Sequence, residues 1–168
     1  MTPSPFVGKL KTLFPIAEIV CIAGFVLGFL LKKQDYPIGG EIVMLSLVAL
    51  AGIYFLSAYL PPDARPAEES EQKAGFLRLF GRTIAPKVLG IGSAVMVVGI
   101  LFAVQQMKGS EQMLLVASAT LAGASVVGFV SISTDETARK ILGPLLLRAV
   151  PLLFIGVYLL SNPLSVAA

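Results

Sequence analysis

The sequence has no histidine and only one cysteine, Cys21, which lies inside an apolar run. An internal disulfide and a Cys/His metal site are therefore both excluded within this chain. The sequence also has no Gly-rich phosphate loop, no metal-ligand spacing and no Ser/His/Asp set. A haem or a catalytic metal would lack its usual ligands, so we predict no cofactor, no metal and no enzymatic activity. Cys21 is interpreted as a small packing residue.

Charge is also scarce, because 14% of the residues are charged and 56% are apolar. A soluble domain usually has about 25% charged residues. The charges fall into short clusters between long uncharged runs. Lysine and arginine outnumber the acids by 13 to 10, but in a membrane protein such an excess mostly decides orientation. We therefore predict the lipid bilayer, and no nucleic acid, as a partner.

Five apolar runs have about the length needed to cross a membrane. A helix rises 1.5 Å per residue, so about 20 residues cross a hydrocarbon core of about 30 Å. Each run must be helical, because lipid offers no partner to an unpaired backbone amide. The sequence thus predicts a single all-α integral membrane domain with five transmembrane helices. The predicted spans are residues 14–31, 41–60, 84–104, 112–132 and 141–160.

Residues 28–52 recur, without gaps, as residues 99–123. Each copy runs from a Gly that follows an apolar run, through a short polar turn, to a Leu-Ala-Gly. The aligned copies share Gly, Leu, Gln, Leu, Ala and Gly, and most other positions pair apolar with apolar. The short linkers force neighbouring spans to be antiparallel. The pattern predicts a duplicated hairpin plus one extra helix.

The basic residues predict the orientation of the chain. With the N-terminus in the cytoplasm, the inner segments hold nine basic residues and the outer segments hold three. This favours a cytoplasmic N-terminus and, after five spans, a periplasmic C-terminus, in a bacterial inner membrane. The three basic residues of the outer segments are Lys32, Lys33 and Lys108. The adjacent pair of Lys32 and Lys33 is the exception to the rule.

The largest polar segment, residues 61–83, is predicted to be a cytoplasmic linker. It begins Pro-rich and acidic, and then becomes amphipathic from residue 73. Its second part predicts a short helix on the inner leaflet, with arginines near anionic headgroups. That helix either sets the entry angle of the third span or docks a soluble partner. Its central residues are Phe76, Leu77, Arg78, Phe80 and Arg82.

Two charges lie within membrane depth, Glu18 in the first span and Arg148 in the fifth, the latter between Pro144 and Pro151. An intramembrane charge is expensive and is a candidate functional residue. Four interpretations stay open. The two side chains pair with each other, snorkel to the headgroups, pair with a neighbouring subunit, or handle an ion or a substrate.

Small residues recur four positions apart along the spans. Such rows let helix backbones approach closely, where dispersion and close packing hold them. They predict either packing between the spans of this chain or a face toward a partner subunit. The predicted pairs are Gly24/Gly28, Gly99/Ala103, Ala119/Gly123 and Ala124/Gly128.

Residues 30–40, LLKKQDYPIGG, and residues 54–62, YFLSAYLPP, carry a family resemblance. They resemble the GldL family, inner-membrane proteins of the gliding-motility and type IX secretion motor of Bacteroidota. The resemblance implies a two-helix hairpin with an aromatic-Pro-Gly turn on the outer side. The family has an acidic residue in its second helix that is thought to couple ion flow to rotation, and the matching position here is Leu50. The family's long cytoplasmic domain is also missing from these 168 residues. The resemblance thus implies a similar hairpin without the motor.

Three functions are consistent with the sequence. The leading hypothesis is a non-catalytic subunit that packs in or stabilises a larger inner-membrane complex, with other membrane subunits or with copies of itself. The alternative is a small channel or transporter that uses Glu18 and Arg148. A weaker alternative is an ion-driven motor component, which the missing acid argues against.

Overall fold

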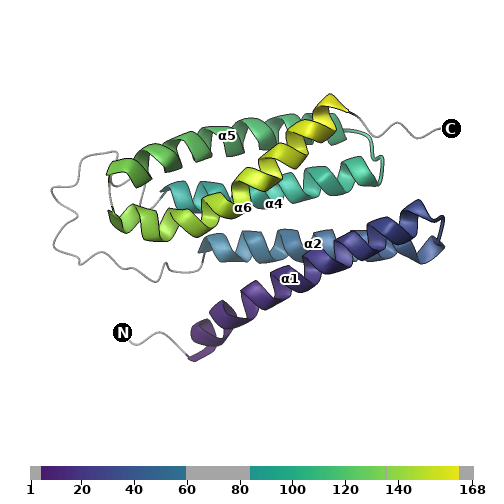
Figure 1. The fold of residues 1–168 in the computed structure, drawn as a ribbon, viewed down its shortest axis with the longest axis horizontal. Coiled ribbons are helices and arrows are strands. Elements are labelled where there is room, and N and C mark those ends of the chain that lie inside the picture. The colour runs from purple at the N-terminus through teal and green to yellow at the C-terminus, as the bar shows by residue number, and fades with distance from the viewer. Residues whose placement is uncertain (1–4, 60–83, 135, 163–168) are drawn as a thin grey trace.

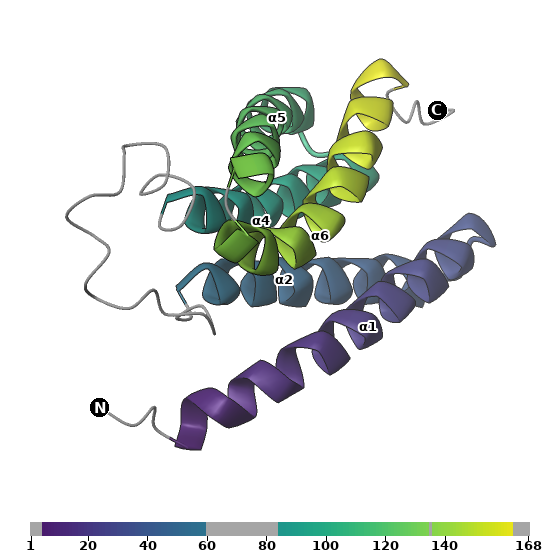
Figure 2. The ribbon, with the colours of Figure 1, turned by 60° about the vertical axis from the view of Figure 1, so that its left-hand side comes forward.

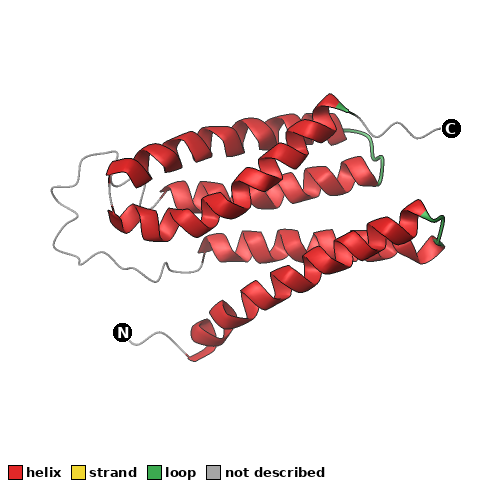
Figure 3. Ribbon diagram, viewed as in Figure 1, coloured by secondary structure: helices red, strands yellow, loops and turns green. Residues whose placement is uncertain are grey.

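The computed structural model describes residues 5–59, 84–134 and 136–162, and these residues form five long helices (Figures 1 and 3). By length and composition, all five are able to cross a membrane. No strand occurs in the described part of the chain. The predicted all-α fold class is therefore confirmed. The helices are α1 (Pro5–Lys33), α2 (Pro37–Tyr59), α4 (Ala85–Val104), α5 (Ser110–Thr134) and α6 (Glu136–Ser161).

The helices extend beyond the apolar runs from which the spans were predicted. α1 begins at Pro5, nine residues before the predicted start at residue 14. α2 begins at Pro37, so the first turn is shorter than the predicted linker. Proline suits the first position of a helix, because the amide that it lacks would have no intrahelical partner there. Hydrophobicity marks the part of a helix that meets lipid, whereas the backbone stays helical into the interface.

α4 lies at the centre of the bundle. α1 packs on α2, α2 on α4, and α4 on both α5 and α6, while α5 also packs on α6. In the two ribbon views, α1 and α2 form one hairpin and α4, α5 and α6 form a neighbouring three-helix group (Figures 1 and 2). α1 begins and α6 ends at opposite ends of the bundle, as expected for an odd number of crossings (Figure 1). Both hairpin turns lie at the same end as the end of α6.

The two hairpin turns have corresponding backbone hydrogen bonds at a separation of 71 positions (99 − 28 = 71), although α2 begins two residues earlier in its copy than α5 does. Asp35 and Gln106 both have φ of 58°, in the left-handed region. The amides of Asp35 and of the residue after it bond back to the end of α1 in a Schellman motif. The corresponding bonds are Asp35→Lys32 and Gln106→Ala103, Tyr36→Leu31 and Met107→Phe102, and Gly39→Tyr36 and Ser110→Met107.

The helix crossings repeat at the same separation. A Cβ added to Gly28 would lie 2.9 Å from the Val43 amide nitrogen, and one added to Gly99 would lie 3.1 Å from Leu114 Cδ2. Val43 and Leu114 are themselves 71 residues apart (114 − 43 = 71), and both are fully buried. Each hairpin is therefore closed where a glycine of its first helix meets a buried aliphatic side chain of its second. The predicted duplication is present in the backbone as well as in the sequence.

Candidate functional site

Glu18 is buried although it lies in a membrane-spanning helix. It is five residues beyond Leu13, where the membrane-spanning part of α1 begins, and only 7% of its surface is exposed. A buried carboxylate is stable only if a positive charge and hydrogen bonds compensate its lost hydration. Its partners therefore decide what Glu18 can do.

Two other helices supply those partners. The Tyr54 hydroxyl of α2 donates a hydrogen bond to Glu18 Oε1 over 2.8 Å. The Arg148 guanidinium of α6 lies 3.0 Å from Glu18 Oε2 through its Nη2. Each carboxylate oxygen thus has its own donor, and the positive and negative charges cancel. We name Glu18, Tyr54 and Arg148 the charge cluster.

The pairing of Glu18 with Arg148 was one of the four open interpretations of these two charges, and the structure shows this pair within a single chain. The Arg148 side chain remains partly accessible, with 36% of it exposed, against 10% for Glu18. α6 continues as one helix through Pro144 and Pro151 on either side of Arg148. The cluster therefore joins α1 to α6 and keeps one edge at the surface of the bundle.

Sequence reasoning missed Tyr54. The residue stands in an uninterrupted apolar run, where a tyrosine looks like ordinary packing. The one feature that could have indicated a role for Tyr54 is its hydroxyl, since a buried tyrosine usually finds a hydrogen-bond partner. Its partner, 36 positions away on another helix, is identified only once the α1–α2 crossing is known.

Lys32 forms a second polar contact, between the two hairpin turns. Its ammonium donates to the Val104 carbonyl oxygen over 2.7 Å and to Gln105 Oε1 over 3.4 Å. The Gln105 side-chain amide in turn donates to the Gly40 carbonyl oxygen over 3.0 Å. We name Lys32, Gln105 and the two carbonyls the turn clamp. Val104 ends α4, where free carbonyls and the negative end of the helix dipole favour a cation. This contact gives Lys32, one of the basic pair on the predicted outer face, a structural role.

Four of the predicted small residues pack within the chain. Gly24 faces Ser46 and Gly28 faces Val43, both on α2. Gly99 faces α5, and Gly128 faces Leu146 of α6. These close approaches are the packing inside the chain that the small-residue rows predicted as one of two alternatives.

The other small residues divide between the core and the surface. Ala124 is buried and Ala103 is half-buried, whereas Ala119 and Gly123 are exposed on α5. A Cβ added to Gly123 would meet nothing within 4 Å. The Ala119/Gly123 pair therefore lies on the outer face of the bundle, with open space beside Gly123.

The predicted amphipathic helix lies outside the described residues, as do its five central residues, Phe76, Leu77, Arg78, Phe80 and Arg82. Among the described residues, no group of three or more His, Cys, Asp or Glu side chains is placed to hold a metal ion. Cys21 is half-buried and is not in a disulfide. Chemistry within the described helices thus concentrates in the charge cluster.

Comparison with protein-family models, with curated proteins and with solved structures found no match to this chain. The resemblance of the first hairpin to the GldL family therefore stays a prediction.

Proposed function

We propose that this chain is a non-catalytic subunit of a larger complex in a bacterial inner membrane, with its N-terminus in the cytoplasm. The proposal rests on the exposed Ala119/Gly123 pair, a small-residue row on α5 with open space beside Gly123. Gly52, which lies 71 positions before Gly123, is likewise exposed on α2 with nothing within 4 Å. Such open rows suit close approach by a helix of another subunit.

α1 supports the same proposal. In the 18-residue window of its membrane-spanning part, only 11% of the residues are buried inside the chain, against 61% for α4. α1 packs along α2 and leaves large apolar side chains on its other sides, among them Ile16, Ile19, Val20 and Leu27. A helix so little covered by its own chain offers an apolar face to lipid or to another membrane subunit.

The test is purification from native membranes in mild detergent, followed by identification of the proteins that come along. Gly123→Leu is expected to abolish co-purification, because the larger side chain fills the space for a partner helix. Gly143→Leu is the matched control, since a Cβ at Gly143 also meets nothing within 4 Å and lies on α6. Isolation of the wild-type chain as a lone monomer would contradict the proposal.

A second candidate is a small transporter or channel that uses the charge cluster. The observation in its favour is the partly exposed Arg148 side chain, which is paired with the buried Glu18. The test is proton and anion flux into liposomes that contain the purified chain. Glu18→Gln and Arg148→Gln would each abolish flux while leaving the helical content intact. Unchanged flux in both variants rules out this candidate.

The orientation follows from the basic residues and is tested by reporter fusions at both ends. We expect a cytoplasmic reporter to be active at the N-terminus and a periplasmic reporter to be active at the C-terminus. Reporters on the same side at both ends would contradict five crossings.

A further inference from the structure

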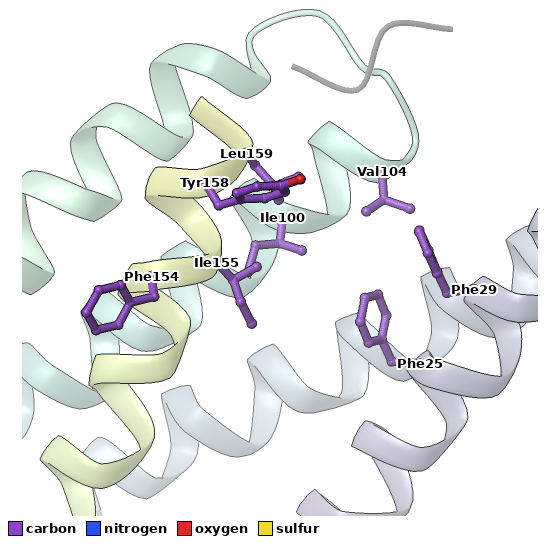
Figure 4. A pocket seen from close by; sticks show the side chains of 8 residues that line it. All are labelled: Phe25, Phe29, Ile100, Val104, Phe154, Ile155, Tyr158 and Leu159. Atoms are coloured by element: carbon purple, nitrogen blue, oxygen red, sulfur yellow. The ribbon is translucent and has the colours of Figure 1, made fainter. Parts of the chain in front are cut away.

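An apolar groove of about 390 Å³ lies between α1 and α6, with α4 behind it (Figure 4). Phe25 and Phe29 face it from one side, and Ile155 faces it from the other. We name it the lateral groove. It is lined by Phe25, Phe29, Ile100, Val104, Phe154, Ile155, Tyr158 and Leu159.

The lateral groove lies between α1 and α6, the same two helices that the ion pair of the charge cluster joins. Phe25 follows Glu18 by seven residues, and Ile155 follows Arg148 by seven, which is about two helical turns in each helix. The same faces of α1 and α6 are therefore joined by an ion pair toward one end and separated by the groove toward the other. All the lining residues fall within the membrane-spanning parts of their helices, so the groove lies at membrane depth.

Hydrocarbon is the occupant that fits this space. The lining is almost wholly apolar, and a water molecule needs two to four polar partners. Lipid acyl chains surround the membrane-spanning part of every helix, and the groove, at about 390 Å³, has room for a segment of one.

A cation lies at the rim of the groove. Val104 lines the groove, and its carbonyl oxygen accepts the hydrogen bond from Lys32. A lysine ammonium has three N–H donors, and the turn clamp uses two of them, so one remains for a phosphate oxygen. The charges of Lys33 and Asp35, the next charged residues in the chain, cancel, so Lys32 leaves this turn net positive. Lysines at this level attract anionic headgroups.

We propose that the lateral groove holds an acyl chain of an anionic phospholipid whose phosphate is bound by Lys32 at the rim. This lipid site is independent of the proposed subunit role and would be present in the isolated chain.

The natural absence of tryptophan allows a clean test. Phe29→Trp places one reporter in the groove, and Phe129→Trp places another on the exposed outer face of α5. Each variant is reconstituted in phosphatidylcholine vesicles with increasing brominated phosphatidylglycerol, which quenches tryptophan fluorescence on contact. We expect quenching at Phe29→Trp to saturate at about fivefold lower phosphatidylglycerol content than at Phe129→Trp, the preference expected from one lysine near the headgroup.

Two further variants assign the headgroup contact. Adding Lys32→Gln to the Phe29→Trp chain should remove the fivefold preference. Lys108→Gln, which changes the lysine of the other hairpin turn, should leave it unchanged. Equal quenching curves at the two reporters, or weaker quenching in the groove because protein covers it, would overturn the proposal. If Phe29→Trp does not fold, Tyr158→Trp serves as the groove reporter, because Tyr158 also lines the groove.

A second measurement tests the groove itself. Ile155→Phe narrows the groove, whereas Val157→Phe changes a neighbouring β-branched residue of α6 that does not line it. Their side chains are equally exposed, at 46% and 47%. Native mass spectrometry of the detergent-purified chain should show a retained phospholipid in the wild type and in Val157→Phe. Its mass should be lost from Ile155→Phe, and retention in both variants counts against the groove as the site.

Discussion

The hairpin of α1 and α2 and the hairpin of α4 and α5 share one backbone plan but occupy different surroundings. Their turns and their glycine crossings correspond at a separation of 71 residues. The first helix of the second hairpin is 61% buried over its membrane-spanning window, whereas that of the first is only 11% buried. The two hairpins thus share a backbone plan, but the first helix of the second hairpin is central in the bundle and that of the first hairpin is peripheral.

The side chains at corresponding positions follow this difference. Glu18 corresponds to Leu89 (89 − 18 = 71), and both are buried. The central helix α4 is held by apolar packing around Leu89. The peripheral helix α1, which packs along α2 alone among its larger contacts, is instead joined to α6 by the Glu18–Arg148 ion pair. Lys32, whose counterpart is Ala103, adds a polar contact between the two turns. α1 is thus attached by its packing along α2 and by specific polar contacts to α6 and to the end of α4.

The largest effect is expected when Glu18 is made to match its counterpart. Glu18→Leu leaves Arg148 without its partner and should lower the free energy of unfolding by about 3 kcal/mol, at the low end for a broken buried pair. The low end applies because 36% of the Arg148 side chain is exposed. Unfolding in mixed detergent micelles measures this change.

The double variant Glu18→Leu/Arg148→Leu is the control for that measurement. It should recover most of the loss, since apolar replacements of a buried ion pair are often neutral or stabilising. A double variant as unstable as Glu18→Leu would show that the ion pair contributes more than neutralisation.

The next largest effect is expected at the glycine crossings, where the two hairpins should differ in how much stability a substitution costs. Gly28→Ala should cost about 1–3 kcal/mol, because the new Cβ would lie 2.9 Å from a backbone nitrogen and overpacking is relieved only by moving a helix. Gly99→Ala should cost less, because its nearest neighbour is the flexible end of Leu114 at 3.1 Å. Thermal unfolding of the two variants in one detergent compares them. Equal costs would mean that the two crossings are equally tight.

Tyr54→Phe removes only a hydroxyl from the charge cluster. Glu18 Oε1 then loses its 2.8 Å donor, and we expect a loss of about 1.5–2 kcal/mol, typical of a hydrogen bond to a charged group. Unfolding of Tyr54→Phe in the Glu18→Leu background is the control, where the same substitution should cost nothing. A full cost in that background would assign the effect to packing.

Substitutions in the two hairpin turns should have the smallest effect, and they should raise the stability of the chain. Gln106 adopts a left-handed φ of 58° that costs most residues about 1–2 kcal/mol. Gln106→Gly should therefore stabilise the chain by up to about 1 kcal/mol. Asp35→Gly should gain less, since aspartate tolerates this conformation better than glutamine. A denaturation midpoint that falls in Gln106→Gly would show that its side chain has a contact worth more than the strain.

Much of the fold could be predicted from the sequence because lipid restricts the options. Long apolar runs must be helical in a bilayer, and the repeat at residues 28–52 and 99–123 anticipated two hairpins of one design. The exact ends were less predictable: α1 begins at Pro5, since polar residues at an interface can be helical too. The candidate site was predictable only in part. Glu18 and Arg148 stand out as charges within apolar runs, whereas Tyr54 does not.

The sequence alone determined that the chain belongs in a lipid bilayer, how many helices it forms and where the turns between them fall. These properties depend on local hydrophobicity and on local backbone hydrogen bonds. Only the tertiary structure decided that α4 takes the centre, that Arg148 reaches Glu18, and that Lys32 ends on the last carbonyl of α4. Those contacts join residues on helices distant in sequence, and their formation depends on how side chains pack at crossings that no local pattern encodes.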